Sequence, residues 1–297
     1  LYALARSGAE NLLVMTGDYP SEGYMGKPKP VFDLDSVQAL KLVEQMNKGV
    51  DIPSYKGRMT LQGTNFFPGA VVSPFKATEA ELMNQYYKLH KKVEAGAKFI
   101  ITQLGYDARK FEELRKYMDI NNLKVPLIGN IYILSVPAAR LMNRNSIPGC
   151  VVTDELMKEL EVEKCKVGKD KEVLLLRYAK LYAILKGMGY DGVNISGHGV
   201  EYQDVRFVIE KGDELTPKWE SFVGEFNYPQ RNGFYYFTRD ESTGLNTDTP
   251  ADRSKTVVKR KPLVYRFFTF VHRLVFHEKA PFFKLAGWAA DIVDRRP

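Results

Sequence analysis

The stretch Lys91–Gln103 reads KKVEAGAKFIITQ and joins the end of a helix to a strand. Its charged first half continues an amphipathic pattern that starts at Glu79. Gly96 then offers the left-handed conformation that commonly ends a helix. The run Phe99–Gln103 is mostly apolar at successive positions, which is typical of a strand buried on both faces of a parallel sheet. The stretch therefore predicts one unit of a parallel α/β fold.

The same unit recurs along the chain. Four further apolar runs indicate buried strands, at Asn11–Met15, Phe66–Val72, Pro126–Ile133 and Gly192–Ser196. Amphipathic segments between the strands predict helices, at Asp35–Met46, Glu79–Ala95, Ala108–Asn121, Pro137–Asn143 and Lys171–Met188. Gly8 and Gly189 repeat the helix-ending role of Gly96. This alternation predicts a parallel α/β domain over residues 1–210.

The charge is distributed unevenly. The chain has 297 residues, with 43 Lys and Arg against 36 Asp and Glu, a formal net charge of +7. The surplus lies in Arg253–Pro297, where 11 basic residues accompany 3 acidic ones, whereas residues 1–252 hold 32 basic and 33 acidic residues. A protein that binds nucleic acid along its whole length would spread its basic residues, so we expect no nucleic-acid partner.

Cysteine content and apolar runs indicate the compartment. The two cysteines, Cys150 and Cys165, are too few for a disulfide framework or a metal knuckle, so we expect a reducing compartment and no metal site. No apolar stretch reaches the roughly 18 residues of a membrane span. Arg6 and Glu10 interrupt the N-terminal stretch, which is not typical of a signal peptide. A cytoplasmic protein is therefore expected. Because Leu1 continues a helical pattern, we also expect the sequence to begin within a domain.

The pattern changes after about residue 210. Residues 211–254 comprise an aromatic-rich segment and then Thr238–Ser254, a polar stretch that predicts a loop or linker. Residues 255–297 form a basic tail with two amphipathic patterns, Leu263–Phe276 and Ala280–Val293. An apolar face opposite basic residues is compatible with an interfacial membrane helix. It is also compatible with a homo-oligomer or with a partner subunit that docks on this tail.

Polar residues follow the predicted strands, at the ends where parallel α/β proteins bind their ligands. Thr16, Gly17 and Asp18 follow the first strand, Gln103 closes the third, and Ser135 follows the fourth. Gly17 permits a close backbone approach to a ligand, and this makes Asp18 a stronger candidate for a ligand-binding residue than an ordinary turn residue would be. The sequence contains no nucleophile elbow, phosphate loop, dinucleotide fingerprint or zinc-protease motif.

The four histidines are too dispersed to indicate a metal site. His198 alone lies at the predicted strand ends, where a ligand or catalytic role competes with an ordinary surface position. His90 lies in the basic run KLHKK, which predicts a solvated helix face.

Four segments, in order, resemble the methylenetetrahydrofolate reductase family. They are GDYP at 17–20, VFDLDSVQAL at 31–40, KKVEAGAKFIITQLGYD at 91–107 and VPLIGNIYILS at 125–135. The match covers about Leu1–Gly199, and its most specific element is KKVEAGAKFIITQ followed by Tyr106 and Asp107. The segment Phe226–Asn246 also resembles a C-terminal extension found in one branch of that family, although the cysteine-rich segment that commonly follows there is absent here.

The resemblance implies a (β/α)8 TIM barrel that holds FAD at the strand ends and reduces 5,10-methylenetetrahydrofolate to 5-methyltetrahydrofolate, a step of one-carbon metabolism and methionine biosynthesis. It implies NAD(P)H or a reduced partner protein as electron donor. Asp18 matches the carboxylate beside flavin and pterin and is the candidate catalytic residue. The matching substrate-binding positions are Asp18, Gln103 and Ser135. The matching cofactor-binding positions are Thr16, Gly17, Asp18, Phe32, Asp33, Lys76, Lys91 and Lys92, of which the two adjacent lysines are equally compatible with a solvated helix face.

The sequence also departs from the family pattern. Only about five βα units are visible, matching the family's strands four to eight, and five strands cannot close an eight-stranded barrel. Either residues are missing from both ends, or the sheet stays open. The family's catalytic glutamate would lie upstream of Leu1, and its arginine after the last strand is replaced near His198. Two rival functions are a pterin-binding methyltransferase on the same barrel and a non-catalytic scaffold or regulatory homologue.

Overall fold

The computed structural model describes residues 1–17, 31, 33–55, 57–167, 171–251, 262–277, 279–280, 282–285 and 288. The chain forms a compact unit, Leu1–Ala251, and a second unit, Asp252–Pro297.

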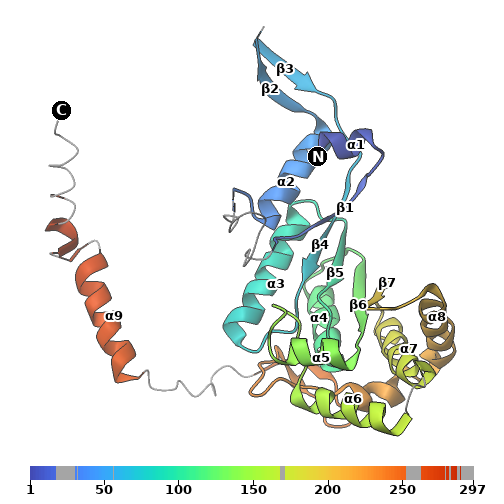
Figure 1. Cartoon of the computed structure of the whole chain (residues 1–297). Coiled ribbons are helices and arrows are strands. Elements are labelled where there is room, and N and C mark those ends of the chain that lie inside the picture. Colours follow the sequence, from blue (N-terminus) through green and yellow to red (C-terminus); the bar gives the residue numbers. More distant parts are fainter. Residues whose placement is uncertain are drawn as a thin grey trace. The chain divides into compact units, whose positions relative to one another are not determined.

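A five-stranded parallel sheet organises the first unit (Figure 1). The strands lie side by side in the order β1 (Asn11–Val14), β4 (Phe67–Val72), β5 (Phe99–Thr102), β6 (Leu127–Ile133) and β7 (Gly192–Gly197). Every pairing is parallel, and the order in space follows the order in sequence. Such a singly wound sheet is the arrangement found in (β/α) barrels, because a doubly wound sheet reverses its order midway. The five predicted strands are confirmed, each to within one residue at either end.

The predicted helices are also confirmed, as α2 (Ser36–Lys48), α3 (Glu79–Glu94), α4 (Ala108–Ile120), α5 (Val136–Asn143) and α7 (Lys171–Gly187). Local chemistry fixes their ends. Asp35 caps α2 by accepting from the backbone N–H groups of Val37 and Gln38. Thr78 and Glu81 form a reciprocal capping box at α3. After α3 the chain turns at Gly96, whose φ of +100° suits a residue without a Cβ.

Other elements were not anticipated from the sequence. They are the antiparallel hairpin of β2 (Val50–Ser54) and β3 (Gly57–Leu61), and helices α6 (Asp154–Val167) and α8 (Tyr202–Leu215). The short helix α1 (Tyr2–Arg6), by contrast, confirms the helical pattern that begins at Leu1 and ends before Gly8. The hairpin buries none of its described side chains. Its sequence therefore lacks the alternation of apolar and polar residues that predicts a half-buried strand.

Helices cover one face of the sheet. Along β6 the burial alternates strictly, with every second residue from Leu127 to Ile133 buried and the residues at the positions between them half-buried. The buried face packs on apolar side chains of α3, α4 and α7, which form one continuous core. On the opposite face Leu13 and Phe67 remain 41% and 47% exposed. The sheet is therefore open, as expected of five strands, which are too few to close an eight-stranded barrel.

The end of the first unit is more ordered than the sequence indicates. A 3₁₀ segment, η1 (Thr216–Phe226), is followed by residues 227–251, here called the extension. The extension contains an antiparallel hairpin of β8 (Phe237–Arg239) and β9 (Asn246–Pro250). The prediction of a loop over 238–254 is therefore wrong for β9. Its threonines and Asp248 lack an apolar period because this strand exposes most of its side chains.

The second unit contains α9 (Leu263–Phe276), which confirms the first amphipathic pattern of the tail. The second predicted tail helix, over 280–293, falls largely outside the described residues. Within the described part of the chain, no helix combines the length and the apolar character that crossing a membrane requires.

Candidate functional site

The carboxyl ends of the five strands meet at one edge of the sheet, because all the strands are parallel. Thr16 and Gly17 follow β1 and are exposed, and Lys76 follows β4. Gln103 follows β5 directly, and Ser135 lies two residues beyond β6. The topology thus brings five of the residues selected from the sequence to a single edge, although they are spread over more than a hundred positions in the chain.

Gln103 is the best-defined polar group at this edge. Its backbone N–H donates to the carbonyl of Val72 on the neighbouring strand, at 2.7 Å. Its side-chain Oε1 accepts from the backbone N–H of Leu104, at 2.9 Å. The Nε2 donor lies beside Gly149, where a Cβ would come within 3.3 Å of it. With the oxygen fixed, the amide presents its Nε2 hydrogens in a set direction, which suits recognition of a ligand acceptor.

Two serines at this edge differ in their bonding. Ser135 caps α5, since its Oγ accepts from the backbone N–H of Ala138 at 3.4 Å, and its own hydroxyl hydrogen can still be donated. Ser73, directly after β4, has a buried Oγ with no hydrogen-bond partner among the described residues. A buried hydroxyl left unpaired costs about 1–3 kcal/mol. Ser73, which was not among the residues selected from the sequence, is therefore a further candidate for a ligand contact.

The adjacent lysines of α3 occupy different environments. Lys91 has an exposed side chain paired with Glu94, at 2.8 Å. Lys92 is buried, and its ammonium donates to the carbonyl of Val71 at 2.5 Å. Burial, with a smaller contribution from Lys88, lowers the pKa of Lys92 to about 8. The interpretation as a solvated helix face thus holds for Lys91 and is wrong for Lys92. Neighbouring residues can differ in this way because successive helix positions point about 100° apart. A role for either lysine at the FAD phosphates stays a prediction.

The remaining selected residues are placed as follows. Asp18, the candidate catalytic carboxylate, and Phe32 lie outside the described residues. Asp33 is exposed in a bend just before α2. His198 is exposed in the turn after β7, at the same edge as Gln103.

The prediction that His90 lies on a solvated face is wrong. Its side chain is half-buried, and its Nε2 lies 3.1 Å from the hydroxyl of Tyr117 on α4. The imidazole and the Tyr117 ring meet edge to face, with centroids 5.7 Å apart. The lysines in KLHKK suggested an exposed helix face. Tyr86 and His90 are four residues apart, however, and so share the face of α3 that packs on α4.

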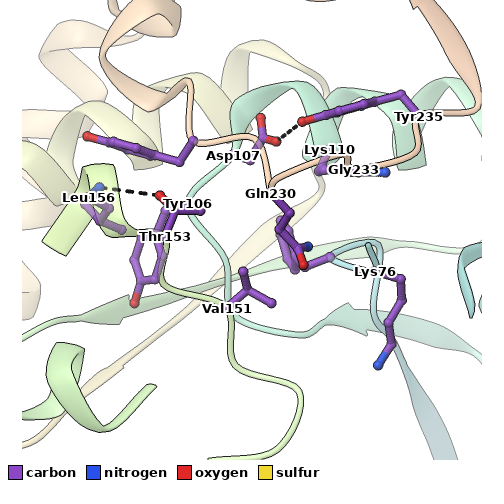
Figure 2. A pocket seen from close by; sticks show the side chains of 12 residues that line it. Lys76, Tyr106, Asp107, Lys110, Val151, Thr153, Leu156, Gln230, Gly233 and Tyr235 are labelled. Carbon is purple, nitrogen blue, oxygen red and sulfur yellow. Dashed lines mark hydrogen bonds between the residues drawn. The ribbon is translucent and has the colours of Figure 1, made fainter. Parts of the chain in front are cut away.

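A small pocket lies beside the edge, where the loops after β4 and β5 meet the extension (Figure 2). Its volume of about 20 Å³ has room for roughly one water molecule, so it is too small for a flavin or a pterin. Tyr106, Asp107 and Lys110 line one side, and Gln230 and Tyr235 of the extension line the other. The pocket therefore marks the contact between the extension and the sheet edge and not a cofactor cavity.

Asp107 and Tyr235 form the central polar contact of this pocket. The Tyr235 hydroxyl donates to Oδ2 of Asp107, drawn as a dashed line in Figure 2. The other carboxylate oxygen accepts from the backbone N–H of Arg109 at 3.1 Å and so caps α4. Burial raises the pKa of Asp107, although the Tyr235 hydroxyl and the charge of Lys110 act in the opposite direction.

A buried ion pair lies next to it. Lys110 and Glu113, one turn apart on α4, contact each other at 3.0 Å with side chains 4% and 0% exposed. Glu113 also accepts from the hydroxyl of Tyr86 at 3.1 Å and from the backbone N–H of Tyr236. Lys110 donates further to the carbonyl of Phe234, at 2.6 Å. This cluster could not be found from the sequence, because charged residues on an amphipathic helix indicate a solvated face.

Among the described residues, no group of three or more His, Cys, Asp or Glu side chains is placed to hold a metal ion. Cys150 is buried.

Comparisons with known proteins identify relatives. A family model described as methylenetetrahydrofolate reductase matches residues 1–174, more than half of the chain. Methylenetetrahydrofolate reductase 2 of Schizosaccharomyces pombe (strain 972 / ATCC 24843) is 26% identical over 269 residues, which cover 84% of this chain and 38% of that protein. The chain thus spans less than two thirds of the length of this curated relative. A solved structure, an uncharacterized protein from Clostridium thermocellum that binds two copies of 5-methyl-5,6,7,8-tetrahydrofolic acid, is 18% identical, with a TM-score of 0.40 over 62% of this chain and 60% of that one.

Proposed function

The chain belongs to the methylenetetrahydrofolate reductase family, and we propose that it binds FAD and a reduced folate for the reduction of 5,10-methylenetetrahydrofolate to 5-methyltetrahydrofolate. The observation that carries the proposal is the carboxyl edge of the sheet, where Thr16, Gly17, Gln103 and Ser135 gather within the part of the chain that the family matches. Ligands of parallel α/β folds bind at this edge.

The donor set at the edge is compatible with a flavin and a pterin. Both ring systems present alternating hydrogen-bond donors and acceptors along an edge, and such edges need amide, hydroxyl and backbone partners. Gln103 offers an oriented amide, and Ser73 offers a buried hydroxyl that lacks a partner among the described residues. Among the residues that the structure describes, none has an atom within 4 Å of a Cβ built on Gly17. When bound, FAD supplies the hydride; NAD(P)H or a reduced partner protein would supply the electrons.

The chain's own residues would bind and orient the two ligands. Gln103 would donate from Nε2 to an acceptor on the pterin, and Ser135 would donate its hydroxyl hydrogen to the folate. Asp18 would accept hydrogen bonds from the pterin and stabilise positive charge that develops on it. For the FAD, the proposed contacts are Thr16, Gly17, Asp18, Phe32, Asp33, Lys76, Lys91 and Lys92.

Binding measurements on the full chain test the proposal. FAD is titrated by quenching of flavin fluorescence, and 5-methyltetrahydrofolate is titrated by calorimetry. We expect Gln103→Ala to weaken folate binding about tenfold, as the loss of one oriented hydrogen bond to a buried polar partner would. Gln45→Ala, on the exposed surface of α2, is the matched control and should leave both affinities unchanged.

The outcomes separate the rival functions. Flavin and folate binding, with the expected loss for Gln103→Ala, supports the reductase. Folate binding without flavin binding would favour a pterin-binding methyltransferase. A chain that binds neither ligand would refute the proposal and favour a scaffold or regulatory homologue.

A further inference from the structure

The 103–107 loop connects the proposed folate contact to the buried carboxylate of Asp107. On the sheet side, neighbouring elements hold it. The Tyr106 hydroxyl donates to the carbonyl of Tyr132 on β6, at 2.8 Å. Gly105 packs so tightly on the ring of Phe75 that a Cβ there would lie 2.2 Å from a ring carbon. The sheet edge thus contacts the middle of the loop, and the position of its last residue depends on other contacts.

Its last residue is held by the extension. The Tyr235 hydroxyl donates to Oδ2 of Asp107. Two cations fix the Tyr235 ring in turn, because the guanidinium carbon of Arg109 lies 3.9 Å from the ring centroid and the Lys110 ammonium lies 4.3 Å from it. Contacts of this kind are worth about 0.5–2 kcal/mol each, the larger values applying where water is excluded.

The residues flanking Tyr235 are anchored as well. The carbonyl of Phe234 accepts from the ammonium of Lys110 at 2.6 Å. The backbone N–H of Phe234 donates to the carbonyl of Ala77 at 2.8 Å. The carbonyl of Phe237 accepts from the guanidinium of Arg109 at 2.9 Å. The backbone on both sides of Tyr235 is therefore bound to α4 and to the loop after β4, so the phenol is held in one place.

We propose that Tyr235 is a positioning residue for the folate site, which fixes the 103–107 loop through Asp107 and thereby orients Gln103. The inference rests on the proposed function of Gln103 as the folate contact. A loop that is already ordered does not have to be ordered when ligand binds, and this raises affinity without any new contact. The extension would thus set folate affinity while touching no ligand.

The role has a characteristic pH dependence. Asp107 faces Arg109 and Lys110 from α4 and Tyr235 from the extension. A hydroxyl donates more strongly to an ionised carboxylate than to a neutral carboxyl group. Loss of the Tyr235 hydroxyl is therefore most damaging while Asp107 is ionised. The difference between the wild type and a variant without this hydroxyl should shrink as the pH falls through the pKa of Asp107, which burial raises.

Hydrogen exchange on the full chain provides the first test, and it needs no ligand. Tyr235→Phe removes the hydroxyl and keeps the ring between the two cations. We expect amide exchange in 103–107 to rise about fivefold to tenfold at neutral pH, the fold-change for one lost charge-assisted hydrogen bond. The variant-to-wild-type ratio should fall toward one at low pH. The control is Lys116→Met, which removes the 2.5 Å bond to the carbonyl of Asn246 and loosens the extension at β9.

Titration of 5-methyltetrahydrofolate completes the test. We expect affinity to fall about threefold to tenfold in Tyr235→Phe and to stay unchanged in Lys116→Met. Unchanged exchange in 103–107, or equal effects of both variants, would overturn the inference. Faster exchange with unchanged affinity would overturn the positioning role while leaving the proposed function intact. A wild-type chain that binds no folate would overturn both.

Discussion

The buried pair of Lys110 and Glu113 allows a sharp test of how the extension is held. Lys110→Met removes the cation that compensates the fully buried Glu113 carboxylate and also removes the donor to the carbonyl of Phe234. Glu113 would keep its hydrogen bonds from Tyr86 and from the backbone of Tyr236, but it would be a buried charge without its cation. The variant would then hold an uncompensated buried charge beside the contacts that fix the extension to α4.

The magnitude follows from this geometry. Removing one partner of a buried ion pair costs about 3–5 kcal/mol, and a carbonyl that loses its donor adds about 1 kcal/mol. We therefore expect Lys110→Met to lower the free energy of unfolding by about 4–6 kcal/mol. Glu113→Gln leaves the Lys110 ammonium without its anion and should cost a similar amount. The double variant contains neither charge, so its cost should fall below the sum of the two single costs by at least about 2 kcal/mol.

Urea unfolding, followed by circular dichroism and by tyrosine fluorescence, measures all three variants against the wild type. Lys211→Met is the control, since Lys211 pairs with Glu214 on the surface, with side chains 41% and 63% exposed. Such an exposed pair contributes about 0–1 kcal/mol. Additive costs in the double variant, or a cost for Lys110→Met no larger than that for Lys211→Met, would refute the reasoning.

Two more predictions concern the sheet and α3. A Cβ on Gly69 would lie 2.2 Å from the ring of Phe99, so Gly69→Ala should lower the free energy of unfolding by about 1–3 kcal/mol. Gly224→Ala, whose Cβ would meet no atom of the described residues within 4 Å, should not lower it, and thermal denaturation compares the two variants. Lys92 has its pKa lowered to about 8, so the folded state binds fewer protons than the unfolded state between about pH 8 and 10.5. Wild-type stability should therefore rise with pH across this window relative to Lys92→Met, by up to about 3 kcal/mol, and parallel curves from urea unfolding would contradict the buried lysine.

The sheet can be predicted from the sequence because its signals are local. An apolar run of a few residues, a glycine after a helix and an amphipathic stretch each depend on neighbours in the chain. Parallel pairing then places Gln103 and Ser135 at one edge without further information. Strand β9 and the β2–β3 hairpin could not be predicted in this way, because their strands bury few side chains and so lack the periodic pattern.

The environment of the charged residues could not be predicted in the same way. Lys92 and Lys110 lie on helices whose polar residues indicate a solvated face, yet both are buried. What permits their burial is an acceptor supplied from elsewhere in the chain: the carbonyl of Val71 for Lys92, and the carbonyl of Phe234, 124 positions away, for Lys110. Burying a charge is tolerable only where such partners exist, and a local pattern cannot show them.

By itself, then, the sequence determined the order of strands and helices, the edge of the sheet that carries the candidate ligands, and the family resemblance. Only the tertiary structure decided that the extension contacts the end of the 103–107 loop, where the Tyr235 hydroxyl donates to Asp107. The physical reason is that strand and helix periodicity is set by side chains a few residues apart, whereas a buried carboxylate is stabilised by whichever donors the completed fold brings to it.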